Sequence, residues 1–263
     1  MNLTILIRIY YKTYYNSYKD SMKRRKKKLM KYLFTSSVEK CCKKSLKRII
    51  KRFGYEDFDY IIYGYDDTEF NEKIFKYCNF IYEKEKSEWD VLGKSITPEI
   101  CKKYDYIFMW ISDIDLNNFS YKNFINIMKH NNLEIAQPAL SYKSYYNYLI
   151  TLKNKNYKIG RLTDFVEAMV PVFSKDAYIK FWKIIIEDLF LDTYRKSHFY
   201  WGFDILAKSI CEYKKMGIID CETVTNTKLI QSHKSEELLD IEKFFKKYSS
   251  YKHSEQIIYG SLK

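Results

Sequence analysis

The chain has 263 residues, of which 46% are hydrophobic and 30% charged, and this composition excludes an intrinsically disordered protein. The length favours one large α/β domain over two small ones. The formal net charge of +13 lies at one end: residues 1–52 hold 17 Lys and Arg against 2 acidic residues, and the remainder holds 29 basic and 31 acidic residues. A nearly neutral body argues against a nucleic-acid groove, so we expect no nucleic-acid partner.

Residues 1–30 are predicted to form a basic, poorly ordered leader, and residues 31–263 to form the folded domain. The basic run Lys23–Lys28 suits either a solvated tail or a peripheral contact with an anionic membrane. The apolar stretch Leu3–Ile9 is much shorter than the ~20 residues of a membrane span, and Arg8 interrupts it. Six cysteines follow no metal-ligand or dense disulfide spacing. We therefore expect a cytoplasmic protein that contacts membranes at most peripherally.

The first half of the predicted domain alternates short apolar strands with helices. Ser36 and Glu39 have the spacing of a capping box, which predicts a helix that begins at Ser36 and ends at Gly54. Ser120 is predicted to cap a second helix, through His130. Apolar runs predict strands at Tyr32–Phe34, Phe58–Tyr63 and Tyr104–Trp110.

The second half continues the same alternation. Ser174 is predicted to cap a long helix, and Gly217 to end another helix over Gly202–Met216. Strands are predicted at Leu133–Leu140, Ala168–Phe173 and Ile218–Asp220. This order predicts a Rossmann-like α/β domain, with a mostly parallel central sheet flanked by helices. Ligands bind such sheets at the carboxyl ends of the strands.

Acidic side chains follow two of the predicted strands, and the first of them, Phe58–Tyr63, is followed by Asp66 and Asp67. Asp113 and Asp115 come directly after the apolar strand Tyr106–Ile111, where two carboxylates can share a Mg²⁺ or Mn²⁺ ion that bridges to a diphosphate. A solvated turn is the alternative interpretation of this pair. His233 is a candidate third metal ligand, or simply an exposed histidine. No glycine-rich phosphate loop, zinc pattern or nucleophile elbow is present.

Two further acids are candidates for proton transfer. Asp204 lies at the start of a predicted helix, and Glu167 precedes a predicted strand. Either carboxylate could accept the proton of an attacking alcohol. The alternatives are a helix-dipole role for Asp204 and an ordinary surface position for Glu167.

Four segments together carry a resemblance to a known family. Their order and spacing resemble those of the family called domain of unknown function 707, whose members are regarded as GT-A-like glycosyltransferases. The resemblance covers about residues 30–230 and implies a GT-A-like fold. The four segments are Lys103–Trp110, Leu133–Leu140, Phe165–Ser174 and Trp201–Asp204.

The chain departs from the family pattern at two positions. The family shows an acidic cluster after the tryptophan of the third strand. Here Asp113 matches its last acid, whereas Ile111 replaces its first, so Asp115 would be recruited from a slipped position. The family also tends to carry a histidine six residues after the aspartate that matches Asp220, and this chain has Asn226 there.

The leading hypothesis is a metal-dependent hexosyl- or pentosyltransferase that moves a sugar from a UDP- or GDP-sugar to a carbohydrate hydroxyl, with inversion. One alternative is an inactive GT-A-like protein that binds a carbohydrate or nucleotide, and another is a polyanion binder that uses the basic leader. In the leading hypothesis Mn²⁺ or Mg²⁺ is held by Asp113, Asp115 and His233, the nucleotide by Thr35, Asp66 and Asp113, and the base is Asp204 or Glu167.

Overall fold

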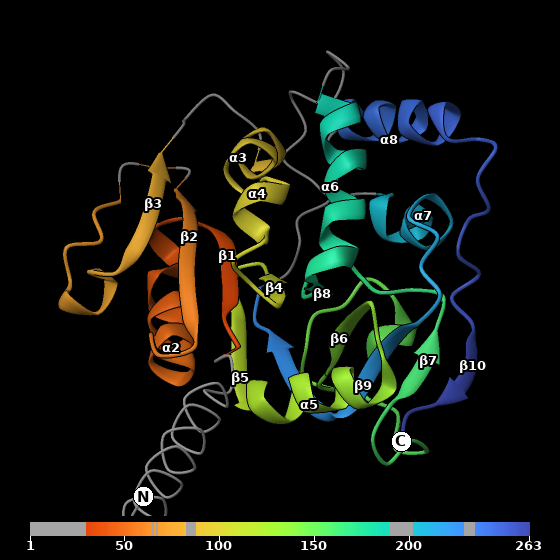
Figure 1. The fold of residues 1–263 in the computed structure, drawn as a ribbon, viewed down its shortest axis with the longest axis horizontal. Coiled ribbons are helices and arrows are strands. Elements are labelled where there is room, and N and C mark those ends of the chain that lie inside the picture. The colour runs from red at the N-terminus through yellow and green to blue at the C-terminus, as the bar shows by residue number, and fades with distance from the viewer. Residues whose placement is uncertain (1–29, 65, 67, 83–87, 190–201, 229–234) are drawn as a thin grey trace, which may run out of the picture. The chain divides into compact units, whose positions relative to one another are not determined.

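The structure is a computed structural model that describes residues 30–64, 66, 68–82, 88–189, 202–228 and 235–263. Residues 31–263 form one compact unit around a single sheet (Figure 1). The sheet follows the order β10-β7-β9-β6-β8-β4-β1-β2-β3, and β5 pairs with β9 off this path. The strands are β1 (Tyr32–Val38), β2 (Phe58–Gly64), β3 (Cys78–Tyr82), β4 (Tyr106–Met109), β5 (Ile114–Asn118), β6 (Ile135–Leu140), β7 (Arg161–Thr163), β8 (Val172–Ser174), β9 (Met216–Asn226) and β10 (Ile258–Ser261).

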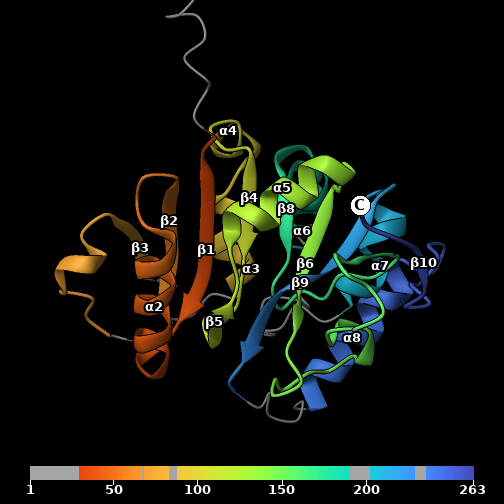
Figure 2. The same ribbon diagram turned by 90° about the horizontal axis from the view of Figure 1, so that it is seen from below.

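Helices cover both faces of this sheet. Figures 1 and 2 show α5 and α6 on opposite sides of it. The helices of the described chain are α2 (Lys43–Phe53), α3 (Glu88–Ser95), α4 (Pro98–Cys101), α5 (Tyr121–Asn131), α6 (Lys175–Leu189), α7 (Phe203–Ile210) and α8 (Ser235–Lys247). Short 3₁₀ turns are η1 (Lys40–Cys42), η2 (Lys73–Phe75) and η3 (Leu149–Thr151).

Most strands of the sheet run in one direction. β1 is parallel to β2 and β4, β2 to β3, and β6 to β9. The exceptions are β5, β7 and β8, and β8 inserts antiparallel between β4 and β6. The sheet is therefore mixed but mostly parallel. In Figure 2 the arrowheads of β1 and β9 point to the same edge, called the carboxyl edge below.

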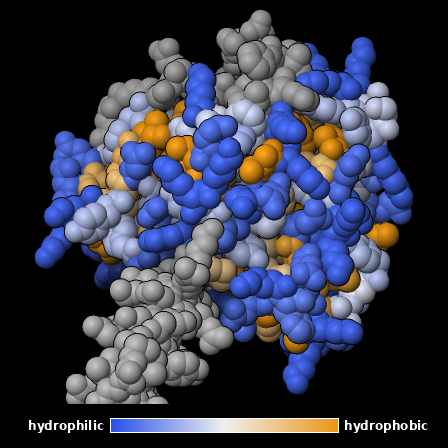
Figure 3. Space-filling view, viewed as in Figure 1, coloured by the Kyte–Doolittle hydropathy of each residue, from blue (hydrophilic) through white to orange (hydrophobic). Residues whose placement is uncertain are grey.

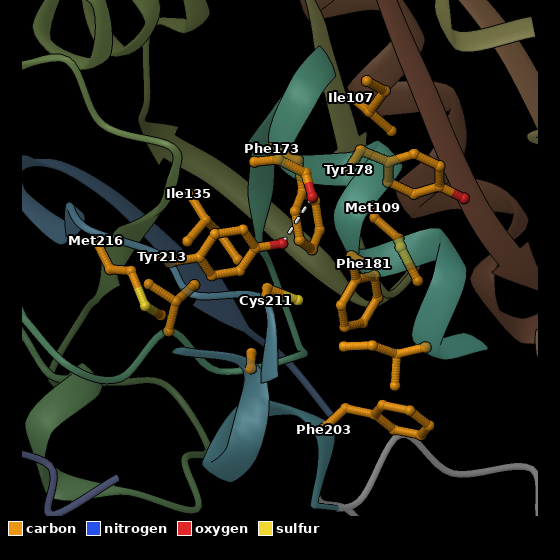
Figure 4. Packing of buried hydrophobic residues seen from close by; sticks show 14 of the residues in the cluster. Ile107, Met109, Ile135, Phe173, Tyr178, Phe181, Phe203, Cys211, Tyr213 and Met216 are labelled. Carbon is orange, nitrogen blue, oxygen red and sulfur yellow. Dashed lines mark hydrogen bonds between the residues drawn. The ribbon is translucent and has the colours of Figure 1, made fainter. Parts of the chain in front are cut away.

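Strand periodicity gives each face of the sheet its own core. Successive side chains point to opposite faces, so Leu33 joins a cluster that includes Phe181 of α6, whereas Phe34 packs on Phe53 of α2 with ring centroids 5.9 Å apart. Figure 4 shows the first cluster, in which the Tyr213 hydroxyl donates to the carbonyl of Ala177 at 2.7 Å. Two aromatic-rich cores thus clamp the sheet in three layers, as the sequence predicts.

Three of the predicted helix ends are confirmed. The Ser120 hydroxyl accepts from the Asn123 amide at the start of α5, and the Ser174 hydroxyl accepts from the Ala177 amide at the start of α6. Gly54 ends α2 with a φ of 74°, a backbone conformation that favours glycine.

Other predicted boundaries are wrong. Ser36 does not cap a helix, because β1 continues to Val38 and Ser36 pairs in register with Ile62. The predicted strand Ala168–Phe173 is reduced to β8, which starts at Val172. The predicted helix Gly202–Met216 is also too long, since α7 ends at Ile210 and Met216 already begins β9. At Ser36 and Met216 a strand ladder overrides the local pattern, whereas residues 168–170 form a turn before β8.

The predicted leader, residues 1–30, falls almost wholly outside the described residues and stays a prediction. No helix in the described ranges is long and apolar enough to cross a membrane. The face seen in Figure 3 is largely hydrophilic, with apolar residues in small separate groups. This pattern is that of an ordinary wetted surface.

Candidate active site

The turn after β1 brings two of the predicted acids to one place. The Asp66 carboxylate accepts from the backbone amide of Lys40 at 3.0 Å, and the Cys42 thiol donates to the Asp113 carboxylate at 3.3 Å. Both acids therefore face the turn Glu39–Cys42 at the carboxyl edge. The pKa of Asp66 is lowered, chiefly by a hydrogen bond from Thr68, so Asp66 is an anion at neutral pH.

Thr35 lies in β1, just before this turn. Its side chain is only 1% exposed, and its hydroxyl has no hydrogen-bond partner among the described residues. Its carbonyl accepts from the Trp110 amide at 3.1 Å, which fixes the end of β4 beside the end of β1. A buried hydroxyl without a partner is unusual in a native core and is a natural contact for a ligand.

Lys228 completes this corner, although sequence reasoning missed it. Its ammonium nitrogen lies 3.9 Å from an Asp113 oxygen and 3.8 Å from a Glu39 oxygen. Burial lowers the pKa of Lys228, but the neighbouring acids, Asp113 first, outweigh burial and raise it. We call Thr35, Asp66, Asp113 and Lys228 the donor corner.

The predicted metal pair is only partly assembled. Asp113 faces Lys228, whereas an Asp115 oxygen lies 3.7 Å from a guanidinium nitrogen of Arg48 on α2. Across the part of the chain that the structure describes, no group of three or more His, Cys, Asp or Glu side chains could hold a metal ion. His233 lies outside the described residues. Of the three predicted metal ligands, Asp113 is thus the one that belongs to the donor corner.

The other two predicted residues, Glu167 and Asp204, form a buried carboxylate pair. Glu167 is 2% exposed and Asp204 is 7% exposed. They meet at Ala168, whose amide donates to Asp204 at 3.5 Å. The Met169 carbonyl in the same segment accepts from the Ile111 amide at 3.0 Å. Glu167 therefore lies on a segment that contacts Asp204 of α7 and also runs beside the residues leading to Asp113.

Specific contacts hold Glu167. One carboxylate oxygen accepts from the side-chain amide of Asn147 at 2.8 Å, and the Glu167 amide donates to the Gln137 side chain at 2.6 Å. Its second oxygen has no partner within the described chain. Burial raises the pKa of Glu167 to about 8; the Asn147 hydrogen bond lowers it and the charge of Asp204 raises it further. Glu167 is therefore mostly protonated at neutral pH.

Asp204 owes its position to the start of α7. Gly202 has a φ of 92°, and a Cβ there would lie 2.9 Å from the Phe244 ring, so only glycine fits this helix start. Burial raises the pKa of Asp204 to about 7, against hydrogen bonds from backbone amides. A cavity of about 20 Å³ adjoins Asp204 and is lined otherwise by apolar residues. That is room for about one water molecule.

A third buried acid is structural. Asp220 is fully buried; one of its oxygens accepts from the Asn154 amide at 2.6 Å and lies 3.5 Å from a guanidinium nitrogen of Arg161. The same guanidinium donates to the carbonyls of Ile150 and Leu152 at 2.7 and 2.6 Å. This pair fastens the segment after β6 to β7 and β9.

The family follows from a match over nearly the whole chain. The model for the family described as a protein of unknown function, DUF707, matches residues 8–257. The chain belongs to the DUF707 family. No curated protein sequence matches this DUF707 protein.

Solved structures resemble the DUF707 chain in fold. S. aureus TarS 1-349 in complex with UDP-GlcNAc is 9% identical with a TM-score of 0.51, covering 79% of this chain and 61% of that one. The same TarS fragment with UDP gives 10% identity and a TM-score of 0.45, covering 76% and 59%. A protein from Desulfovibrio desulfuricans G20, described as a nucleotide-diphospho-sugar transferase, gives 11% and 0.36, covering 66% and 70%. The chain spans about three fifths of the TarS fragment. The DUF707 chain thus has a GT-A-like fold, as the resemblance implies.

Proposed function

We propose that this DUF707 protein is an inverting glycosyltransferase that moves a hexosyl or pentosyl group from a nucleotide-sugar to a carbohydrate hydroxyl. The proposal depends on one observation: the segment that carries Glu167 is hydrogen-bonded to Asp204 through the Ala168 amide and to Ile111, two residues before Asp113, through the Met169 carbonyl. In a GT-A-like fold, that arrangement supplies a proton acceptor next to a site for a nucleoside diphosphate.

The donor corner suits a UDP- or GDP-sugar. Thr35 offers a buried hydroxyl that has no partner among the described residues, and Asp66 offers an anionic carboxylate for N–H or O–H groups of the nucleoside. Lys228 places a positive charge beside Asp113, where it would attract the diphosphate. These contacts orient the donor while the sugar projects toward the carboxylate pair.

A divalent cation fits this corner in a limited way. Mg²⁺ commonly takes one or two protein carboxylates and completes its shell with water and phosphate oxygens. Asp113 would be the main protein ligand of Mn²⁺ or Mg²⁺, with Asp115 and His233 as further candidates. When bound, the cation would neutralise the charge on the leaving diphosphate.

Asp204 would act as the general base. It accepts the proton of the acceptor hydroxyl as that oxygen bonds to the anomeric carbon. The bond from this carbon to the phosphate oxygen breaks, and its electron pair leaves with the nucleoside diphosphate. A single displacement inverts the anomeric configuration. A pKa of about 7 is suited to a base that works near neutral pH. Glu167, protonated there, would hold the hydroxyl in place, and it is the second candidate for the base.

A binding protein without turnover is the second candidate function, and Asn226 favours it. Asn226 occupies the position where the family tends to carry histidine, and its side chain is 1% exposed. Its amide nitrogen donates to the Tyr145 carbonyl at 3.4 Å, and its amide oxygen accepts from the Lys228 amide at 3.2 Å. The side chain is therefore used to fix the backbone.

Replacing Asp204 by Asn tests the proposal. We expect nucleoside diphosphate release from UDP- and GDP-sugars, with oligosaccharide acceptors and Mn²⁺ present, to fall by roughly 10²- to 10⁴-fold, since the amide cannot take a proton. Nucleotide binding, measured by calorimetry, should persist. Full activity of the Asp204→Asn protein would transfer the role of base to Glu167, for which Glu167→Gln is the matched variant. An unmodified protein that binds nucleotide and releases none from any donor would support the binding-only function.

The same calorimetry tests the role of the metal in nucleotide binding independently of sugar transfer. We expect UDP or GDP affinity to increase with Mn²⁺ and to lose this dependence in Asp113→Ala. Affinity that ignores both changes would remove the metal from the proposal. Lys228→Ala is the control for the positive charge that the protein itself supplies, because loss of the Lys228 ammonium group should weaken nucleotide binding with or without Mn²⁺.

A further inference from the structure

The loop between β6 and η3 carries exposed aromatic side chains. Tyr142, Tyr145 and Tyr146 are 60%, 47% and 45% exposed. Leu149, at the end of the same loop, is 73% exposed. Aromatic side chains gathered on one short exposed segment are typical of a binding surface. We call residues 141–149 the tyrosine loop.

The backbone of the tyrosine loop is fixed near its start. The Ser144 hydroxyl accepts from the Asn226 amide at 2.9 Å, and the Tyr145 amide donates to the Asn226 carbonyl at 3.1 Å. The Ser141 hydroxyl shares a 2.7 Å hydrogen bond with the Thr225 hydroxyl. These bonds tie the loop to the end of β9, two residues before Lys228 of the donor corner.

The end of the tyrosine loop is fixed by a buried cation. Arg161 donates to the carbonyls of Ile150 and Leu152, directly after the loop, and is itself paired with Asp220. The exposed rings are thus presented from an anchored backbone. A surface of this kind loses little conformational freedom when a ligand binds.

The tyrosine loop also reaches the carboxylate pair. Asn147 is exposed, yet its side-chain amide donates to the buried Glu167 at 2.8 Å. The Tyr148 ring packs edge-on against Phe165 with ring centroids 4.7 Å apart; burial first, and then the charges of Asp204 and Glu167, raise the pKa of Tyr148. The loop therefore joins the donor corner, through β9, to the groups that would take the acceptor's proton.

We propose that the tyrosine loop is the acceptor subsite and that Tyr145 and Tyr146 stack on the sugar rings of a neutral oligosaccharide. The proposal rests on the glycosyltransferase function above. A pyranose ring has an apolar C–H face that covers an aromatic ring, while its hydroxyls stay in water or bond to the phenol groups. Tyr142 is less free for stacking, because the Lys155 ammonium lies 5.7 Å from its ring centroid. The proposed function assigns the nucleoside to the donor corner, so the occupant of the tyrosine loop is the acceptor.

A binding experiment without turnover tests this subsite. The probes are maltohexaose, cellohexaose and xylohexaose, titrated into the full chain with UDP and Mn²⁺ and followed by saturation-transfer NMR and calorimetry. We expect at least one probe to bind, and Tyr145→Ala/Tyr146→Ala to weaken it roughly tenfold or more, the effect of losing two stacked rings. Tyr77→Ala is the matched control, because Tyr77 is 67% exposed and far from the loop in sequence. Thermal melts should show both variants folded, since the replaced rings are exposed.

The outcomes separate the two proposals. Equal binding by the double variant, or no binding of any probe, would overturn the acceptor subsite. Weakened UDP binding in the double variant would assign the loop to the donor and would also overturn it. Oligosaccharide binding that depends on Tyr145 and Tyr146, without release of nucleoside diphosphate from any donor sugar, would keep the subsite and refute the transferase.

Discussion

Replacing Glu167 by Gln tests whether a buried, protonated carboxyl group lies in the site. The pKa of Glu167 rises from 4.5 to about 8 on folding, chiefly through burial. The folded protein then keeps a proton that the unfolded chain loses above pH 4.5. Stability from this group is therefore full at low pH and falls as pH rises, until the folded carboxyl ionises near pH 8.

The expected magnitude follows from the two pKa values. One pKa unit corresponds to about 1.4 kcal/mol, so linkage predicts that Glu167 alone removes about 3 kcal/mol of unfolding free energy between pH 5.5 and pH 8.5. Glutamine keeps the size of the side chain and an oxygen for Asn147, but it cannot ionise. The variant should therefore lose about 3 kcal/mol less than the unmodified protein over this range. Asp204 and Asp220, whose pKa values are raised to about 7 and 6, add a slope of the same sign that both proteins share.

Urea unfolding at pH 5.5, 6.5, 7.5 and 8.5 measures this difference, with m-values compared to confirm one transition. Asp176→Asn is the control, because the Asp176 side chain is 86% exposed and its replacement should leave the pH dependence unchanged. Parallel stability curves for Glu167→Gln and the unmodified protein would refute the buried, protonated carboxyl. They would also remove the argument that assigns Glu167 and Asp204 different protonation states.

Two other predictions concern the frame around the site. Arg161→Ala leaves Asp220 buried without its cation and should lower the unfolding free energy by about 3 to 5 kcal/mol in urea titrations, whereas Arg48→Ala, at an ion pair with a half-exposed arginine, should cost at most about 1 kcal/mol. Equal losses in the two variants would contradict the structural role of the buried pair. Removal of residues 1–28 should leave a cooperative thermal melt at an unchanged midpoint, because residues 31–263 form a compact unit with its own core; a lost or broadened transition would show that the domain needs the leader.

The sequence predicts those parts of the fold in which a local pattern, such as a helix cap or an apolar run, is compatible with only one structure. Ser120 and Ser174 each precede a helix and accept an amide hydrogen bond there. The apolar run Phe58–Tyr63 is β2 with one further residue. Strand β5 was not predicted, because its pairing with β9 depends on residues more than 100 positions away.

Gly217 and Ser36 show why the remaining boundaries failed. Gly217 is a strand residue, and a Cβ there would lie 3.1 Å from Leu133 and 3.2 Å from the Arg161 carbonyl. Close packing between distant segments therefore explains this glycine, rather than the end of a helix. Ser36 has the spacing of a cap, but the ladder between β1 and β2 extends past it.

The candidate site was predicted only in part, because some of its contacts join residues that are distant in the sequence. Asp204 and Glu167 were both proposed from their positions at element ends, and the structure adds that they meet at Ala168. Lys228 could not be singled out, because it is one of 46 basic residues and only the fold brings it to Asp113. Asn147 likewise could not be identified from the sequence, because its role depends on its hydrogen bond to Glu167, 20 positions further along the chain.

The short strand β8 affects how the proposed donor site and the proposed acceptor site are positioned relative to each other. β8 meets β4 over three residue pairs and β6 over two, so the ladder is narrow between β4, which leads to Asp113, and β6, which leads to the tyrosine loop; the pairing of β5 with β9 is a second link between them. Apolar side chains such as Phe173 and Ile135 must therefore set much of the spacing across this joint. Sequence drift in this core would tune the distance between leaving group and acceptor while every polar residue of the site stays the same.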